Sequence, residues 1–98
     1  MLFAIRFVDK ADSLPLRQQR MAAHIAWLDQ EREHVLVGGS LRHSPEQAPV
    51  GGLWVVEAQS KAAAEALLKQ DPFYSAGLRE SWEILHWSKA FEDRKVPV

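Results

Sequence analysis

Two polar residues, His24 and Asp71, carry most of the chemistry that this sequence could support. His24 lies in the segment MAAHIAWL, on the flank of a predicted helix, and Asp71 opens the segment DPFYSAGL, just after a second predicted helix. If the two helices lie side by side, the Asp71 carboxylate can accept a hydrogen bond from one imidazole nitrogen and leave the other free as a base. The pair predicts acid–base catalysis; the alternative is that His24 is a packed, hydrogen-bonded residue at the core boundary.

Asp71 also has a structural role open to it. Asp-Pro at the start of a helix is the usual N-cap followed by proline at the first helical position. Gly77 would then end that short helix at its C′ position. Because an aspartate can cap a helix and still direct an oxygen at a histidine, both roles are predicted together.

A second group of candidates would bind a small substrate. Gly38 and Gly39 lie in the short apolar segment VLVGGSL, where the missing side chains would leave room for a ligand. Ser40 follows them and would donate a hydrogen bond to a developing oxyanion. Glycine in a strand also marks a bulge or a close backbone approach, so a structural role for this segment stays open.

The predicted helices add further candidates. At ~100° per residue Arg17 falls on the same flank as His24, and Arg20 lies further round, so either could hold an anionic substrate group. Trp27 could stack on an aromatic ligand, although tryptophans mostly fill cores and interfaces. Phe73, the aromatic residue of the Asp-Pro-aromatic segment, completes the predicted substrate-binding set.

We predict no metal and no cofactor. There is no cysteine, and His34, His43 and His86 lack the spacing of a metal site. The two Gly-Gly pairs precede strands or lie in them, whereas a phosphate-binding loop would open a helix.

The hydrophobic pattern predicts four strands and two main helices. The strands are expected at residues 2–8, 35–41, 53–57 and 80–87. The second helix is expected after a cap at Ser60 and must stop before Pro72. The first helix is expected from an N-cap at Ser13 to about His34, with an apolar stripe at Leu14, Met21, Ile25 and Leu28.

The element order β-α-β-β-α-β is that of a ferredoxin-like split βαβ fold, an α+β architecture with both helices on one face of an antiparallel sheet. The uncovered face should then be polar, yet the first, third and fourth strands carry large apolar residues in both directions. An apolar sheet of this extent usually marks an association surface. We therefore expect a homodimer in which two sheets pack face to face; the alternative is singly exposed apolar residues without a role.

Size and charge restrict the other partners. The 98 residues form one domain, and the formal net charge of -1, from 12 basic and 13 acidic residues, gives no single-sign surface for nucleic acid or an anionic membrane. The apolar run at the N-terminus is broken by Arg6 and is too short for a signal sequence or a membrane span. We expect a cytoplasmic protein that binds neither nucleic acid nor membrane.

Four segments, AAHIAWLDQ, VGGSLR, GGLWVVEA and DPFYSAGL, resemble the YCII-related domain family, and the resemblance runs end to end. It implies a single domain at residues 1–98. Residues 88–98 would form a C-terminal tail, and no function is inferred from that tail. It implies the sheet-to-sheet homodimer of a dimeric α+β barrel, similar to muconolactone isomerase and to cofactor-free monooxygenases. The family's His-Asp pair carries over onto His24 and Asp71.

The few family members of known activity act on ring-hydroxylated, sometimes chlorinated, aromatics. The resemblance therefore implies a cofactor-independent enzyme of lyase, dehydrochlorinase or isomerase type that acts on a small cyclic or aromatic substrate. His24 would move the proton and Asp71 would orient His24. The alternative is a non-catalytic dimer that binds a small ligand or serves as a scaffold, in which the pair only ties one helix to the other.

Overall fold

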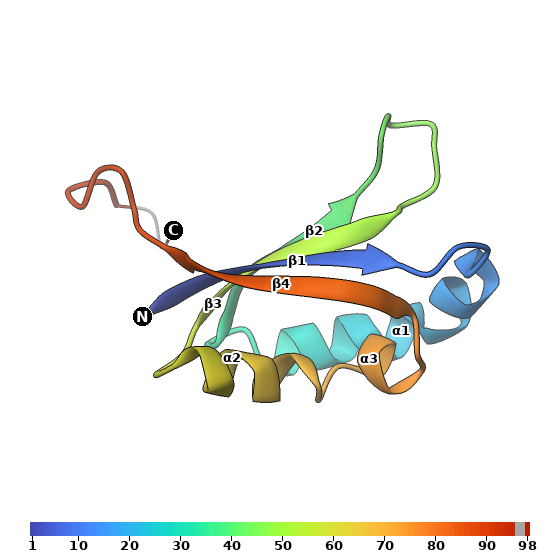
Figure 1. Cartoon of the computed structure of the whole chain (residues 1–98), viewed down its shortest axis with the longest axis horizontal. Coiled ribbons are helices and arrows are strands. Elements are labelled where there is room, and N and C mark those ends of the chain that lie inside the picture. Colours follow the sequence, from blue (N-terminus) through green and yellow to red (C-terminus); the bar gives the residue numbers. More distant parts are fainter. Residues whose placement is uncertain (96–97) are drawn as a thin grey trace.

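The computed structural model describes residues 1–95 and 98 as one antiparallel sheet with its helices on one face (Figure 1). The strand order β2-β3-β1-β4, with every pairing antiparallel, confirms the ferredoxin-like α+β fold predicted from the sequence. In chain order the elements are β1 (Leu2–Asp9), α1 (Leu14–Gln30), β2 (Val35–Leu41), β3 (Gly51–Glu57), α2 (Lys61–Leu68), α3 (Pro72–Ser75) and β4 (Arg79–Trp87).

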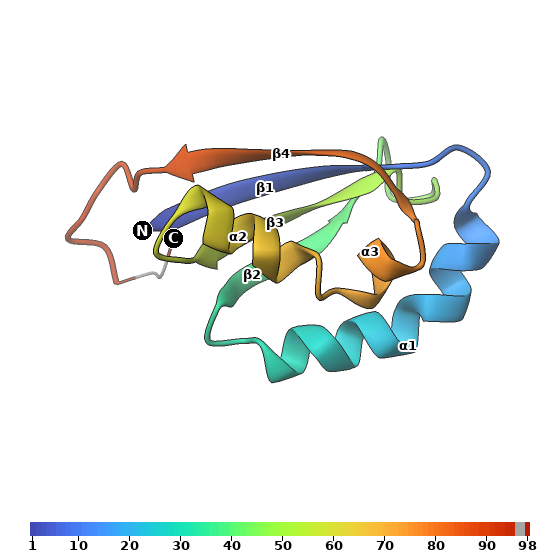
Figure 2. The ribbon, with the colours of Figure 1, turned by 60° about the horizontal axis from the view of Figure 1, so that its bottom comes forward.

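The central strand β1 explains how the sheet and helices fit together. Ile5 lies opposite Trp54 of β3 and Ile84 of β4, so one side chain from each of three strands points to the same face. Successive residues of a strand point to opposite faces, so Phe3 and Phe7 share this face with Ile5. Figure 2 shows the helices that cover it, with α1 running alongside the row formed by α2 and α3.

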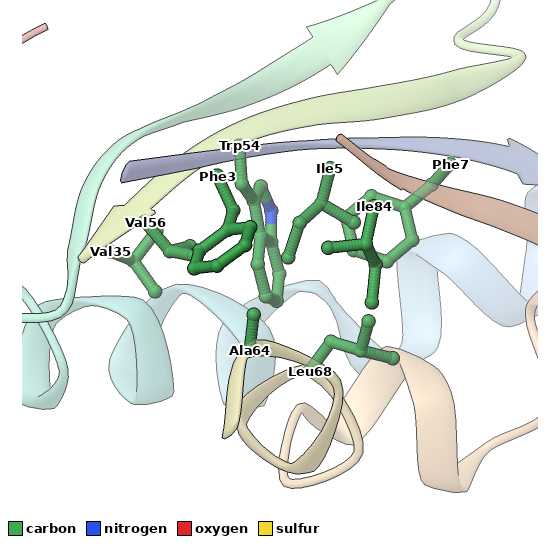
Figure 3. Close-up of a cluster of buried hydrophobic side chains, with 9 residues drawn as sticks. All are labelled: Phe3, Ile5, Phe7, Val35, Trp54, Val56, Ala64, Leu68 and Ile84. Atoms are coloured by element: carbon green, nitrogen blue, oxygen red, sulfur yellow. The ribbon is translucent and has the colours of Figure 1, made fainter. Parts of the chain in front are cut away.

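The hydrophobic core fills the space between the sheet and the helices (Figure 3). Burying a large apolar side chain completely is worth ~1.5–3 kcal/mol, so this layer supplies most of the favourable free energy of folding. Its buried members are Phe3, Ile5, Phe7, Val35, Trp54, Val56, Ala64, Leu68 and Ile84.

The buried side of α1 differs from the predicted apolar stripe. Leu14 and Ile25 are 39% and 54% exposed, whereas Arg17 and His24 are the buried residues of this helix. Met21 is half-buried between them. The stripe prediction was wrong at Leu14 and Ile25, because polar side chains with partners inside the protein can be buried as well as apolar ones, and it is confirmed at Leu28, which packs against the core.

The end of α1 also differs from the prediction. The helix ends at Gln30, four residues before the predicted end near His34. The chain turns there because the backbone N–H groups of His34 and Val35 both donate to the Glu31 carbonyl, at 2.9 and 2.8 Å, which leads directly into β2.

The other predicted boundaries need smaller corrections. Ser13 precedes α1 but its hydroxyl donates to the Lys10 carbonyl instead of capping the helix. Ser60 caps α2 as predicted, because its hydroxyl accepts a hydrogen bond from the Ala63 N–H at 3.1 Å. Strand β3 begins at Gly51 and β4 at Arg79, slightly before the predicted starts.

The second face of the sheet carries no helix (Figure 1). Arg6 and Glu83 form an ion pair there across β1 and β4 at 2.5 Å. Large apolar side chains surround this pair and remain 37–56% exposed: Val8, Val37, Leu41, Leu53, Leu85 and Trp87. We call these six residues the open apolar face. The prediction that strands are apolar in both directions is confirmed, and the homodimer inferred from it stays a prediction.

In the part of the chain that the structure describes, none of the helices combines the length and the apolar character needed to cross a bilayer.

Candidate functional site

His24 and Asp71 meet where α1 passes α3. Nδ1 of His24 lies 2.7 Å from Oδ1 of Asp71, and the two residues are 7% and 1% exposed. This contact was predicted from the sequence and the structure contains it. The catalytic role of the pair stays a prediction.

The local sequence around Asp71 explains why its carboxylate is held in place. Asp71 is the N-cap of α3, and its Oδ1 also accepts a hydrogen bond from the Phe73 N–H at 3.1 Å. Pro72 fits the first helical position, where no N–H is required. Gly77 follows the end of α3 at φ 78°, a backbone conformation that favours glycine. The predicted cap and the predicted end of this short helix are both confirmed.

The imidazole of His24 is also fixed by stacking. Its ring lies on the Phe73 ring, with centroids 3.8 Å apart and planes 10° apart. Because one edge of the imidazole faces Asp71 and one face lies on Phe73, the ring has little freedom to turn. No residue that the structure describes is hydrogen-bonded to the other ring nitrogen, Nε2. That nitrogen is therefore the one available to a ligand.

Two arginines and a second aspartate extend the site. Nε of Arg17 donates to Oδ2 of Asp9 at 3.1 Å, and Nη1 of Arg79 donates to Oδ1 of the same carboxylate at 2.7 Å. Nη2 of Arg79 lies 3.9 Å from Oδ2 of Asp71. A continuous charged cluster therefore links Asp9 to His24 through Arg79 and Asp71.

Burial affects the pKa of one member of this cluster, Arg79. Burial lowers the pKa of Arg79 from its ordinary value, against the Asp9 and Asp71 carboxylates, which raise it. A guanidinium nevertheless keeps its charge at neutral pH. Among the described residues, Nε of Arg79 is also one of two side-chain atoms that are sealed from solvent without a hydrogen-bond partner, the other being Oγ of Ser44.

Sequence reasoning missed Asp9 and Arg79. One signal could have found them: Asp9 ends β1 and Arg79 begins β4, and the two are partners in the antiparallel register. Opposite charges at the adjoining ends of paired strands predict a contact once the topology is known. No local pattern indicates that this contact is buried and connected to Asp71.

The predicted substrate-binding residues lie at different distances from the pair. Phe73 contacts His24 directly, and Arg17 is buried near it, with its guanidinium 5.1 Å from the Phe73 ring centroid. Arg20 is exposed, one turn before His24 in α1. Trp27 packs against Trp54 in the core, with ring centroids 5.5 Å apart.

Trp54 lies between the glycine segment, residues 38–40, and the His24–Asp71 pair. A Cβ atom on Gly38 would lie 3.4 Å from the Trp54 indole, whose ring is 6.4 Å from that of His24. Gly39 has open space around its Cβ position. Ser40 is exposed, and its hydroxyl accepts one long hydrogen bond, 3.4 Å, from Arg42. A cleft shared by this segment and the His24–Asp71 pair stays a prediction.

Four surface hollows of about 280 to 530 Å³ lie elsewhere, and neither His24 nor Asp71 lines any of these four. The largest of them lies between the end of α1 and α2, where His34, Glu57 and Leu67 contribute to its lining. Within residues 1–95 and 98, no group of three or more histidine, cysteine, aspartate or glutamate side chains is arranged to hold a metal ion.

Comparisons with known proteins give a consistent result. The model of the YCII-related domain matches residues 1–88. Protein YciI of Escherichia coli O6:H1 and Protein YciI of Shigella flexneri are each 31% identical to the chain over 98 residues, which cover 93% of this chain and 100% of each relative.

Solved structures extend the comparison. The 5-chloro-2-hydroxyhydroquinone dehydrochlorinase TftG of Burkholderia phenoliruptrix AC1100, in complex with 2,5-dihydroxybenzoquinone, is 29% identical, with a TM-score of 0.81 over 90% of this chain and 94% of that one. Protein Atu4242 of Agrobacterium tumefaciens is 17% identical, with a TM-score of 0.56 over 100% of this chain and 99% of that one, and shows likeness of fold alone.

Proposed function

The chain belongs to the YCII-related domain family, and from this membership and the geometry at His24 we propose that it is a small acid–base enzyme that needs no cofactor. Its substrate would be a small cyclic or aromatic compound, and its reaction a lyase, dehydrochlorinase or isomerase step. The relative TftG, with a TM-score of 0.81, supports this class because it is a dehydrochlorinase of a hydroxylated aromatic ring.

The observation that carries the proposal is the 2.7 Å contact between Nδ1 of His24 and Oδ1 of Asp71. An ionised carboxylate can only accept hydrogen bonds, so the hydrogen of this bond belongs to Nδ1. The lone pair of the imidazole is then on Nε2, the nitrogen with no hydrogen-bond partner among the described residues. Such a positioned base contributes roughly 10²- to 10⁴-fold to a reaction that is limited by proton transfer.

The chemistry requires only one proton to move at a time. In a dehydrochlorinase step, Nε2 of His24 takes a proton from the substrate, the electron pair left behind forms a new double bond, and chloride leaves with the electron pair of its bond to carbon. In an isomerase step, the same nitrogen returns the proton to a different carbon. Asp71 stabilises the imidazolium that forms in either case, because its carboxylate already accepts the hydrogen bond from Nδ1.

The surrounding residues are proposed to bind the substrate. Arg20 is a better candidate for an anionic group than Arg17, because Arg17 already donates to Asp9 and to the Gly51 carbonyl. Ser40 would donate a hydrogen bond to a ring oxygen, and Gly38 and Gly39 would leave room beside it. Phe73 and Trp27 would offer apolar surface to a ring, with Phe73 also stacked on His24.

We further propose that the protein is a homodimer joined through the open apolar face. The six exposed side chains of that face form a surface of the kind that usually marks association. A second copy of the sheet would cover them and complete a dimeric α+β barrel.

One observation favours a second candidate function, a non-catalytic dimer that binds a ligand or serves as a scaffold. His24 is only 7% exposed, and four hollows on the surface do not reach it. In that case the pair would stabilise the packing of α1 on α3 without turning over a substrate.

An assay of hydroxylated aromatic rings, each with and without a ring chlorine, separates the two functions. We expect turnover by the wild-type protein, measured as ring absorbance and chloride release, and EDTA should leave it unchanged. His24→Ala should lower kcat by roughly 10²- to 10⁴-fold without unfolding the protein. The matched control is His34→Ala, because His34 also contacts a carboxylate, that of Glu31 at 3.0 Å, on the surface.

Two results would contradict the enzyme. His24→Ala could retain full turnover, which would remove His24 from the chemistry. Alternatively, the wild-type protein could turn over none of the rings while His24→Ala lowers the melting temperature, which would favour the scaffold.

A further inference from the structure

Arg79 lies between the two carboxylates of the buried cluster. Its Nη1 donates to Asp9 at 2.7 Å, its Nη2 lies 3.9 Å from Oδ2 of Asp71, and its side chain is 2% exposed. We infer that Arg79 is a positioning residue that keeps the Asp71 carboxylate ionised and thereby fixes which nitrogen of His24 carries hydrogen. The catalytic consequence rests on the proposed function, whereas the effect on the imidazole does not.

The state of Asp71 decides the tautomer of His24. While the carboxylate is ionised it only accepts, so the hydrogen lies on Nδ1 and the lone pair lies on Nε2. If Asp71 carried a proton, it could donate to Nδ1, and the neutral imidazole would then carry its hydrogen on Nε2. The base would be lost although no atom of His24 had been removed.

A charged carboxylate is costly away from water unless nearby positive charge or hydrogen-bond donors compensate it. Asp71 is 1% exposed, so little water can stabilise its charge. The Phe73 N–H and the His24 Nδ1 contact only Oδ1, which leaves Oδ2 to Arg79. The Arg79 guanidinium is therefore the positive charge that faces this oxygen.

Arg79 is held at this point from several sides. Its guanidinium lies 4.2 Å from the centroid of the Phe7 ring, and Asp9 binds it from the paired strand. On the third side, a Cβ atom at Gly52 would lie only 3.7 and 3.8 Å from its two terminal nitrogens. Because these contacts come from β1 and β3, Arg79 cannot turn away from Asp71 without disturbing the sheet.

The test measures the imidazole directly. In ¹⁵N-labelled protein at neutral pH, long-range ¹H–¹⁵N spectra of the ring report which nitrogen of His24 carries hydrogen. Wild type should show predominantly the Nδ1–H form. Arg79→Met keeps an unbranched apolar stem without the charged guanidinium and should lower the ratio of Nδ1–H to Nε2–H by about 10-fold. A 10-fold change in the tautomer ratio corresponds to ~1.4 kcal/mol, which is the order of the difference between hydrogen bonds to charged and to neutral acceptors.

Two further variants complete the design. Arg79→Lys restores a positive charge and should keep the ratio nearer to the wild-type value. Arg32→Met removes a surface arginine that pairs with Asp29, and it should leave the ratio unchanged. Where a substrate has been found, Arg79→Met should lower kcat by about 10-fold with little change in KM, because the base and not the binding surface is altered.

An unchanged ratio in folded Arg79→Met would overturn the inference. If Arg79→Met does not fold, the double variant Asp9→Asn/Arg79→Met, which removes one carboxylate charge together with the arginine, is measured in its place, and an unchanged ratio there would overturn the inference as well. If neither variant folds, Arg79 is a structural residue and the inference is wrong. If the wild-type protein turns over no ring, only the proposed function fails, because the tautomer ratio is still measured.

Discussion

Each face of the sheet departs from the usual distribution of side chains at some positions. Between the sheet and the helices, the side chains of Asp9, Arg17, Asp71 and Arg79 are buried with His24. On the other face, six large apolar side chains are exposed, and charged residues usually occupy such positions. The difference lies in the partners: the buried charges have theirs within the chain, whereas the apolar side chains of the open apolar face lie beside exposed ion pairs such as Arg6–Glu83 and have no helix over them. The buried charges are therefore paired within one copy, whereas the proposed second copy would cover the open apolar face.

The largest effect is expected from breaking the buried face at Asp9. Asp9→Ala leaves Nε of Arg17 and Nη1 of Arg79 without their acceptor, and both guanidinium groups remain buried. Removing one partner from a buried ion pair costs ~3–5 kcal/mol. Urea unfolding followed by circular dichroism should show the free energy of unfolding reduced by that amount.

The matched control is Asp29→Ala, which removes an aspartate from an exposed ion pair with Arg32. Exposed pairs contribute only ~0–1 kcal/mol, so the unfolding curve should move little. If Asp9→Ala costs no more than Asp29→Ala, the buried charges are solvated in solution and the contrast between the two faces is wrong.

The second effect concerns the open apolar face. Leu85 is 56% exposed on β4 and would be buried by a second copy of the sheet, so Leu85→Asp should separate the proposed dimer. Losing the burial of one leucine costs ~1.5–3 kcal/mol per subunit, before the charge is counted. Sedimentation should show a dimer for the wild-type protein at micromolar concentration and a monomer for this variant.

Ile25→Asp provides the comparison for this experiment. Ile25 is 54% exposed, nearly the same as Leu85, but it lies on α1, away from the open apolar face. Its substitution should leave the dimer intact. A wild-type protein that sediments as a monomer would show that the open apolar face stays in contact with water.

The buried and open faces also differ in how far the sequence predicted them. Alternation of apolar residues gave the strands and the two-sided character of β1 and β3, because each residue of a strand points to a face set by its position. The contact between His24 and Asp71 was predicted because the topology places α1 beside the end of α2, and because the resemblance to the YCII-related family singled out these two residues.

The rest of the buried face could not be predicted from local pattern. Arg17 and Arg79 look like surface residues in the sequence, and only the full set of partners around them makes their burial possible. For the same reason the predicted stripe on α1 was wrong at Leu14 and Ile25. A pattern of apolar residues predicts which side chains are buried in the hydrophobic core. It does not predict the burial of polar side chains that are hydrogen-bonded or ion-paired to one another.

The smallest effect on stability is expected at Ser40. Its substitution should change substrate binding more than the free energy of unfolding. Ser40 is exposed and makes one long hydrogen bond with Arg42, so Ser40→Ala should change the free energy of unfolding by less than ~0.5 kcal/mol. If its hydroxyl donates to a ring oxygen of the substrate, KM should rise by roughly 2- to 10-fold, the value of one neutral hydrogen bond. Ser88→Ala, at another exposed serine, should change neither quantity. An unchanged KM in Ser40→Ala for every ring that is turned over would remove Ser40 from the substrate site, because a residue that contributes nothing to folding and nothing to binding has no role there.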